Sequence, residues 1–120
     1  MARILILDDV FDAVRLMARV LEENGHAVFP FTDEEPALAF IAANPVDLVI
    51  LDIKLKKMSG LDVLARIKQI APRTRTLVLT GYPTVEVARE SIRLGAGEFC
   101  AKPIDNAELE EKVSRLLAAD

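Results

Sequence analysis

Short apolar stretches recur along the chain and predict strands. Four of them lie at residues 4–7, 48–51, 77–79 and 99–101. The first three are continuous rather than alternating, which is typical of strands covered on both faces, as in a parallel sheet. A fifth stretch, at 27–31, contains Pro30. Because proline cannot donate to a strand ladder, this strand is expected at an edge of the sheet.

Helical patterns lie between these stretches. Apolar residues recur at i, i+3, i+4 and i+7 from Val14 to Leu21, which predicts a helix over about 11–24, ended by Gly25. Four further helices are predicted, to about residue 43, through 70, through 94, and from 106 onward. Residues suited to cap their starts are Thr32, with Glu35 at capping-box spacing, Ser59, Thr84 and Asp105.

The resulting order alternates strictly between strand and helix, five of each. Such alternation predicts an α/β fold, a doubly wound parallel sheet with right-handed crossovers and helices on both faces. Five strands with the second at an edge suit the order 2-1-3-4-5. In sheets of this kind ligands bind beyond the carboxyl ends of the strands, at the switch point between strands 1 and 3.

The length of 120 residues and the 52% hydrophobic content fit one domain, residues 1–120. The net charge of −4 gives no support to direct nucleic-acid binding by this domain. The single cysteine excludes an internal disulfide and fits a reducing compartment. No signal peptide and no apolar run of the ~20 residues that a membrane span needs are visible, so a cytoplasmic location is expected.

Polar side chains follow the predicted strands directly. They are Asp8 and Asp9 after the first strand, Asp52 after the third, Thr80 after the fourth and Lys102 after the fifth. Three carboxylates at one sheet edge repel each other unless protons or a cation neutralise them, and a hard ion such as Mg²⁺ suits oxygen ligands. A lysine and a hydroxyl beside them could hold phosphoryl oxygens, and a carboxylate can itself accept the phosphoryl group.

Five motifs carry a resemblance to a known family over essentially the whole chain. They are "ILILDD" (4–9), "DLVILDI" (47–53), "MSGLDVL" (58–64), "TLVLTGY" (76–82) and "GAGEFCAKP" (95–103). Together they resemble the receiver domain of two-component response regulators. The resemblance implies a flavodoxin-like fold and a phosphoprotein that acts in phosphorelay signal transduction as a switch, not as an enzyme on a separate substrate.

The resemblance also implies roles for the polar residues. Asp52 would accept the phosphoryl group from a phosphohistidine of a sensor histidine kinase or a phosphotransfer protein, as an aspartyl phosphate. Asp9 and Asp52 would bind Mg²⁺ directly, together with the backbone carbonyl of Lys54, and Asp8 would act through a metal-bound water. Lys102 would pair with Asp52 or its phosphate.

Further roles concern switching. Thr80 would hydrogen-bond the phosphoryl oxygens and move toward them, and Phe99 would be the aromatic switch residue that turns inward as Thr80 moves. The readout face would be residues 84–118, which would contact an output domain or a downstream protein, with a homodimer on phosphorylation as a further option. The Lys102–Pro103 peptide is expected to be cis.

The chain departs from the family pattern at several positions. Phe99 stands where tyrosine is frequent, and Lys56 replaces a common proline in the loop after the acceptor. Lys54 and Tyr82 stand two residues after Asp52 and Thr80, respectively. The hypothesis from these positions is that Lys54 and Tyr82 tune the lifetime of the aspartyl phosphate; the alternative is that both point to solvent.

The sequence also bears on three alternative functions. A phosphohydrolase with an aspartyl phosphate usually has a second acid where Lys54 stands, and a flavin carrier needs a hydroxyl- and glycine-rich loop where this chain has "DDVFDAV". A degenerate receiver used only for binding would not need the full set of acids, threonine and lysine. The sequence leaves open whether the domain stands alone or belongs to a longer regulator.

Overall fold

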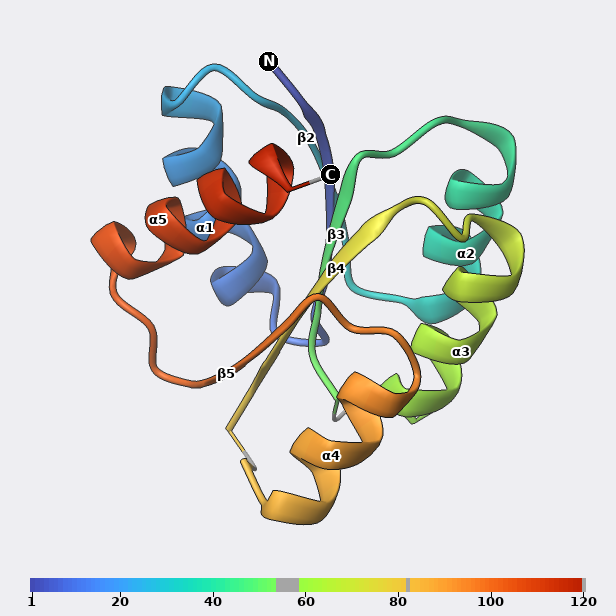
Figure 1. The fold of residues 1–120 in the computed structure, drawn as a ribbon. Coiled ribbons are helices and arrows are strands. Elements are labelled where there is room, and N and C mark those ends of the chain that lie inside the picture. The colour runs from blue at the N-terminus through green and yellow to red at the C-terminus, as the bar shows by residue number, and fades with distance from the viewer. Residues whose placement is uncertain (54–58, 82, 120) are drawn as a thin grey trace.

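The computed structural model describes residues 1–53, 59–81 and 83–119. Five parallel strands form one sheet in the order β2-β1-β3-β4-β5, which confirms the predicted fold (Figure 1). The strands are β1 (Arg3–Leu7), β2 (Ala27–Phe31), β3 (Leu48–Leu51), β4 (Arg75–Thr80) and β5 (Glu98–Ala101). The helices are α1 (Phe11–Glu23), α2 (Glu34–Ala43), α3 (Gly60–Ile70), α4 (Val85–Arg93) and α5 (Asn106–Ala118).

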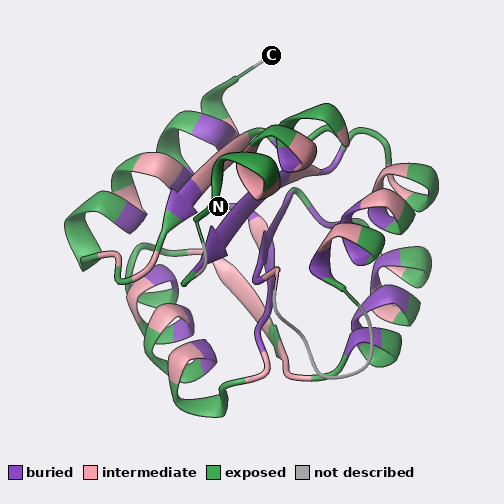
Figure 2. Ribbon diagram, turned by 90° about the horizontal axis from the view of Figure 1, so that it is seen from below, coloured by how far each residue is buried: buried purple, intermediate pink, exposed green. Residues whose placement is uncertain are grey.

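The sheet separates two apolar clusters. Alternate strand residues point to opposite faces, so Ile4 and Ile6 pack with α1 and α5, whereas Leu5 and Leu7 pack with α2 and α3. Figure 1 shows α1 and α5 on one side of the sheet and α2, α3 and α4 on the other. Burial is concentrated in the strands and on the inner sides of the helices (Figure 2). This two-sided cover explains why the inner strands are continuous apolar runs.

The edge position of β2 agrees with its proline. Pro30 is exposed and pairs only with the β1 side, opposite Ile6. The strand is half-buried, and Phe29 packs on Phe40 of α2 with ring centroids 4.8 Å apart. None of the helices in the described part of the chain has the length and apolar content needed to cross a bilayer.

Three of the predicted helix starts are confirmed. The side chains of Ser59, Thr84 and Asp105 each accept a backbone N–H from the first turn of α3, α4 and α5. Each cap satisfies a donor that the helix itself cannot pair. The predicted stop at Gly25 is also confirmed. Gly25 after α1 and Gly95 after α4 have φ of 91° and 102°, the left-handed conformation that favours glycine.

The predicted capping box at Thr32 is wrong. The N-cap of α2 is Asp33, without a side-chain capping bond, and the first backbone bond of the helix runs from the N–H of Ala37 to the Asp33 carbonyl at 3.4 Å. A start at Thr32 would require this bond from Pro36, which has no N–H. The position of Pro36 therefore shifts the start of the helix by one residue.

Several strands are longer than their apolar runs. β1 begins at Arg3, β4 extends from Arg75 to Thr80, and β5 begins at Glu98. The ladder is a backbone interaction, so polar residues continue it where a neighbouring strand is in register, as for Arg75 beside Leu48.

Candidate functional site

The predicted acids lie together because β1 and β3 are neighbours in register. Leu7 pairs with Leu51, so Asp8 and Asp52 leave the sheet side by side. The backbone N–H of Asp52 donates to the Leu7 carbonyl at 3.1 Å, and that of Asp8 donates to Phe31 at 3.2 Å. The strand ladders thus position both carboxylates at the carboxyl edge of the sheet.

Asp8, Asp9 and Asp52 form a compact cluster. One carboxylate oxygen from each lies within 4.8 Å of the others. Asp8 and Asp52 are only 2% and 8% exposed, whereas Asp9 is half-buried. One Asp8 oxygen accepts the backbone N–H of Val10 at 3.0 Å, which fixes the orientation of that carboxylate. Three like charges held this close and this far from water require a positive partner.

Lys102 supplies part of that positive charge. Its Nζ lies 2.5 Å from Oδ2 of Asp8 and 3.1 Å from Oδ2 of Asp52. Burial lowers the pKa of Lys102, but the hydrogen bonds and charges of Asp8 and Asp52 outweigh this effect and raise the pKa. The sequence predicted the pair with Asp52; it missed the shorter contact with Asp8, for which the only signal was the shared strand edge.

The donor set fits a divalent metal ion. Three carboxylates and one ammonium leave a formal charge of −2, and carboxylate oxygens are the ligands that Mg²⁺ and similar hard cations prefer. The residues present therefore could hold such an ion. The expected third ligand, the backbone carbonyl of Lys54, lies outside the described residues, as do Lys56 and Tyr82.

Thr80 and Phe99 lie on the next two strands of the sheet, β4 and β5. Thr80 is the last residue of β4 and is fully buried, and its carbonyl accepts the backbone N–H of Lys102 at 2.7 Å. Phe99 is half-buried on β5 opposite Val78 and packs against the α2–α3 side of the core. The Lys102–Pro103 peptide is cis. This backbone hydrogen bond connects Thr80 to Lys102, whose side chain contacts Asp8 and Asp52.

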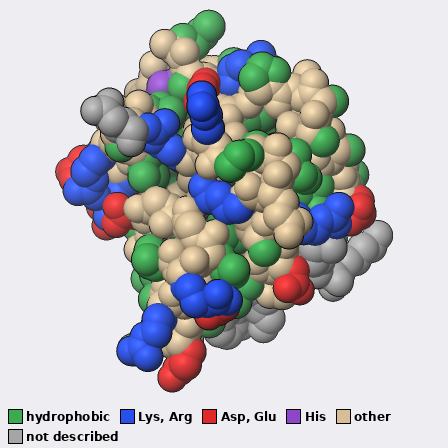
Figure 3. Space-filling view, turned by 45° about the vertical axis from the view of Figure 1, so that its right-hand side comes forward, with side chains coloured by type: hydrophobic (Ala, Val, Ile, Leu, Met, Phe, Trp, Pro, Cys, Tyr) green, Lys and Arg blue, Asp and Glu red, His purple; other side chains and the backbone are tan. Residues whose placement is uncertain are grey.

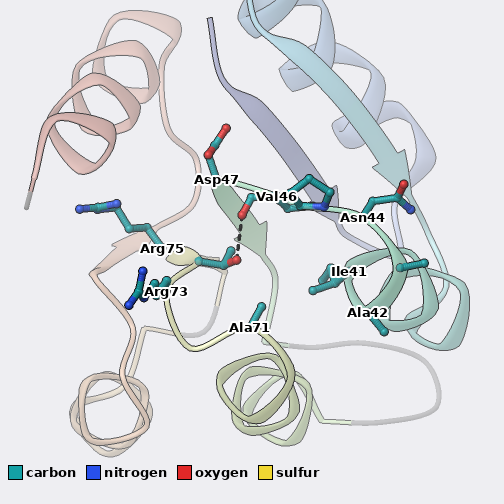
Figure 4. Close-up of a pocket in the computed structure, with 11 residues that line it drawn as sticks. Ile41, Ala42, Asn44, Val46, Asp47, Ala71, Arg73 and Arg75 are labelled. Carbon is teal, nitrogen blue, oxygen red and sulfur yellow. Dashed lines mark hydrogen bonds between the residues drawn. The ribbon is translucent and has the colours of Figure 1, made fainter.

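A hollow of about 570 Å³ lies at the other end of the strands, beside the amino ends of β3 and β4. It is formed by the C-terminal end of α2 and the connection from α3 to β4, and its floor includes the bond from Thr74 Oγ1 to the Val46 carbonyl at 2.8 Å (Figure 4). It contains none of the predicted site residues. On the face drawn in Figure 3, Lys and Arg side chains are spread out, with acidic side chains beside several of them. A second hollow, of about 500 Å³, is lined by Lys102 and Pro103 but by none of the three acids. The candidate site is therefore identified by its charged side chains and not by the shape of the surface.

Comparisons with known proteins agree with this geometry. The family model for the response regulator receiver domain matches residues 4–114. The chain is 33% identical over 115 residues to sporulation initiation phosphotransferase F of Bacillus subtilis, covering 96% of this chain and 93% of that protein. It is 35% identical over 116 residues to the nitrogen assimilation regulatory protein NtrX of Azorhizobium caulinodans, covering 95% of this chain and 26% of that protein.

A solved structure shows the same fold. The crystal structure of a CheY-like response regulator receiver domain protein from Methanospirillum hungatei superposes with a TM-score of 0.95 at 30% identity, covering 98% of this chain and 94% of that one. Some relatives are thus about as long as this chain, whereas others are several times longer. The family match, which spans most of the chain, and the gathered acids with their lysine lead to one conclusion: this protein belongs to the response regulator receiver domain family.

Proposed function

We propose that Asp52 accepts a phosphoryl group from a phosphohistidine of a sensor histidine kinase or phosphotransfer protein. A carboxylate oxygen of Asp52 forms a bond to phosphorus while the P–N bond breaks. The electron pair of that bond stays on the imidazole nitrogen, which takes up a proton from solvent. The observation that carries the proposal is the cluster of three carboxylates at the carboxyl ends of the strands, two of which contact Lys102.

The neighbours of Asp52 have distinct roles in this proposal. Asp8 and Asp9 would hold Mg²⁺ with Asp52, Asp8 through water. The bound ion would supply positive charge opposite the phosphoryl oxygens. Lys102 already contacts Asp8 and Asp52 and would follow the transferred negative charge onto the phosphate.

Thr80 and Phe99 would convert phosphorylation into a change of surface. The Thr80 hydroxyl donates to a phosphoryl oxygen and moves toward it, and Phe99 turns inward to fill the space. Thr80 ends the strand that precedes α4, and Phe99 belongs to β5, which packs against α4. Val85 and Ile92 of α4 are exposed apolar side chains. Phosphate would thereby bias an equilibrium between two states of the face formed by residues 84–118.

This face would signal to an output domain or a downstream protein in the cytoplasm. Longer relatives such as NtrX support an output domain on the same chain. A homodimer through residues 84–118 on phosphorylation is the alternative use of the face, and sedimentation with and without a phosphoryl mimic distinguishes the two. The protein would assist its own phosphorylation and dephosphorylation but turn over no separate substrate.

The test is covalent labelling by a small phosphodonor. Wild-type protein is expected to gain one phosphoryl group in the presence of Mg²⁺, and Asp52→Asn is expected to gain none. Asp47→Asn, an exposed acid at the other end of β3, is the matched control and should label like the wild type. Equal labelling of Asp52→Asn and wild type would refute the proposal.

We also propose that Lys54 and Tyr82 set the lifetime of the aspartyl phosphate. Lys54 would contact the phosphoryl group or an acid, and Tyr82 would hinder the attacking water. Both residues lie outside the described residues. Dephosphorylation rates of Lys54→Ala and Tyr82→Ala should differ from the wild-type rate, and unchanged rates would leave both as solvent-facing residues.

A further inference from the structure

The backbone of Gly60 lies directly against the end of β3. Its N–H donates to the Ile53 carbonyl at 2.7 Å. A Cβ atom at this position would lie 2.4 Å from the carbonyl oxygen of Asp52 and 2.4 Å from the Cα of Ile53, whereas ordinary van der Waals contact begins at 3.4 Å. Only a residue without a side chain allows this approach.

Gly60 touches Asp52 and Ile53, the two residues that follow β3 and lie beyond its strand ladders. The ladders of β3 end at Leu51, which pairs with Leu7 and Val78. Beyond it, the bond from the Asp52 N–H to the Leu7 carbonyl, at 3.1 Å, fixes one side of the acceptor backbone. The carbonyl of Asp52 lies against Gly60. The acceptor is therefore held between β1 and the first turn of α3.

The helix on the other side of this contact is firmly anchored. Val63, Leu64 and Ile67 of α3 are fully buried, and Ser59 caps its start through the N–H of Leu61 at 3.2 Å. A close-packed helix resists displacement. A side chain at position 60 would therefore push mainly on Asp52 and its successor, by about 1 Å, the difference between the 2.4 Å approach and ordinary contact.

We propose that Gly60 is a positioning residue for the phosphoacceptor: its missing side chain lets α3 fix the carboxylate of Asp52 relative to Asp8, Asp9 and Lys102. This inference rests on the proposed function of Asp52. A misplacement of about 1 Å can cost about 100-fold in a reaction that depends on alignment. Gly60→Ala is therefore expected to lower both the Mg²⁺ affinity and the phosphorylation rate by about tenfold to 100-fold.

Gly97→Ala is the matched control. A Cβ at Gly97 would lie 2.8 Å from Cδ2 of Leu116 and 3.2 Å from the Thr76 carbonyl, so it also crowds the protein, but at the start of β5 and on other residues. Gly97→Ala should lose stability and keep the wild-type Mg²⁺ affinity and labelling rate. Both variants are compared at a temperature at which thermal unfolding shows them folded.

The outcomes separate the two proposals. If the wild type labels and a folded Gly60→Ala binds Mg²⁺ and labels equally well, the positioning role is wrong while the function of Asp52 stands. If the wild type itself neither binds Mg²⁺ nor labels, the proposed function fails and the role of Gly60 falls with it. Equal losses in Gly97→Ala and Gly60→Ala would show a general effect of crowding and also overturn the inference.

A measurement on the wild type covers the case in which Gly60→Ala does not fold. Coupling between two interactions is reciprocal, so if the Gly60 contact favours the metal-binding geometry, Mg²⁺ must strengthen that contact. Amide hydrogen exchange at Gly60, whose N–H bonds to Ile53, should slow when Mg²⁺ is added. Unchanged exchange at Gly60 in protein that binds Mg²⁺ would contradict the proposal.

Discussion

The ends of the strands form two sides of the sheet, here called the amino edge and the carboxyl edge. At the amino edge, Asp47 accepts the backbone N–H of Arg3 at 2.8 Å, and His26 accepts that of Ala2 at 3.1 Å. At the carboxyl edge, Asp8, Asp9 and Asp52 lie together, and the ammonium of Lys102 contacts two of them, Asp8 and Asp52. Both of these polar side chains at the first edge have a local backbone partner. The second edge accumulates charge of one sign that its own residues do not balance.

This difference in charge identifies the functional site more clearly than the shape of the surface does. The hollow of about 570 Å³ lies at the amino edge, where polar groups are largely satisfied. The carboxyl edge is where burial of like charges costs stability, and such a cost points to a ligand that relieves it. Its acids are therefore expected to respond to a cation, whereas those of the amino edge are not.

The largest expected effect is stabilisation by Mg²⁺. At about 100 times its dissociation constant, Mg²⁺ should raise the free energy of unfolding by about 2.7 kcal/mol, and chelation should reverse the change. Asp9→Asn should lose this response and be more stable than the wild type without metal, because one of three like charges is removed. Urea denaturation measures both.

Asp47→Asn is the control for this effect at the amino edge. It changes an exposed acid outside the cluster, so it should keep the full response to Mg²⁺. A response that is lost in Asp47→Asn and kept in Asp9→Asn would reverse the comparison of the two edges.

A smaller effect is expected at two threonine hydroxyl groups, one just before β4 and one on it. Thr74 donates to Val46 at 2.8 Å, whereas the fully buried Oγ1 of Thr76 has no hydrogen-bond partner among the described residues. Thr74→Val should therefore destabilise the protein by about 1 kcal/mol, and the isosteric Thr76→Val should stabilise it by about 1 kcal/mol. Thermal or urea unfolding decides; the same sign for both variants would be inconsistent with this account.

The smallest effect is the pH dependence contributed by two lysines. Burial lowers the pKa of Lys102, but interactions with Asp8 and Asp52 outweigh burial and raise this pKa above 10.5. The stabilisation of the folded state by Lys102 is therefore complete below pH 10.5 and is lost as the pH rises through the raised pKa. Burial, and then the charge of Arg75, lower the pKa of Lys68 below 10.5. The charged form of Lys68 therefore destabilises the folded protein at lower pH, and this destabilisation disappears as the pH rises toward 10.5.

Urea denaturation of the wild type, Lys102→Met and Lys68→Met between about pH 9 and about pH 12 measures these contributions. Lys102→Met should remove a loss of stability in the upper part of this range. Lys68→Met should remove a gain in the lower part. Identical pH profiles for the two variants would show that the edges do not differ in this respect.

The sequence predicted most of the fold because its signals are strong and local. Continuous apolar runs indicated strands buried on both sides, and Pro30 indicated the edge. The gathering of Asp8 and Asp52 followed from parallel strands ending at one edge. The capping box at Thr32 failed because the missing N–H of Pro36 outweighs a favourable spacing.

Other features of the site depend on distances that a sequence pattern does not contain. The preference of Lys102 for Asp8 depends on how a long side chain crosses from β5 to β1. The contact of Gly60 with Asp52 depends on the approach of two backbones, although a glycine at a helix start hints at it. Departures at Lys54, Lys56 and Tyr82 stay predictions from the sequence, since these residues lie outside the described part of the chain.

The most direct test of the contrast between the edges is an NMR map of the backbone amides. Mg²⁺ is added first and beryllofluoride, a phosphoryl mimic, second. The largest shifts are expected at residues 8–9, 52–53, 80 and 102, followed by changes in α4 and β5 with beryllofluoride. Largest shifts at residues 44–47 and 73–75, around the hollow of the amino edge, would contradict the account.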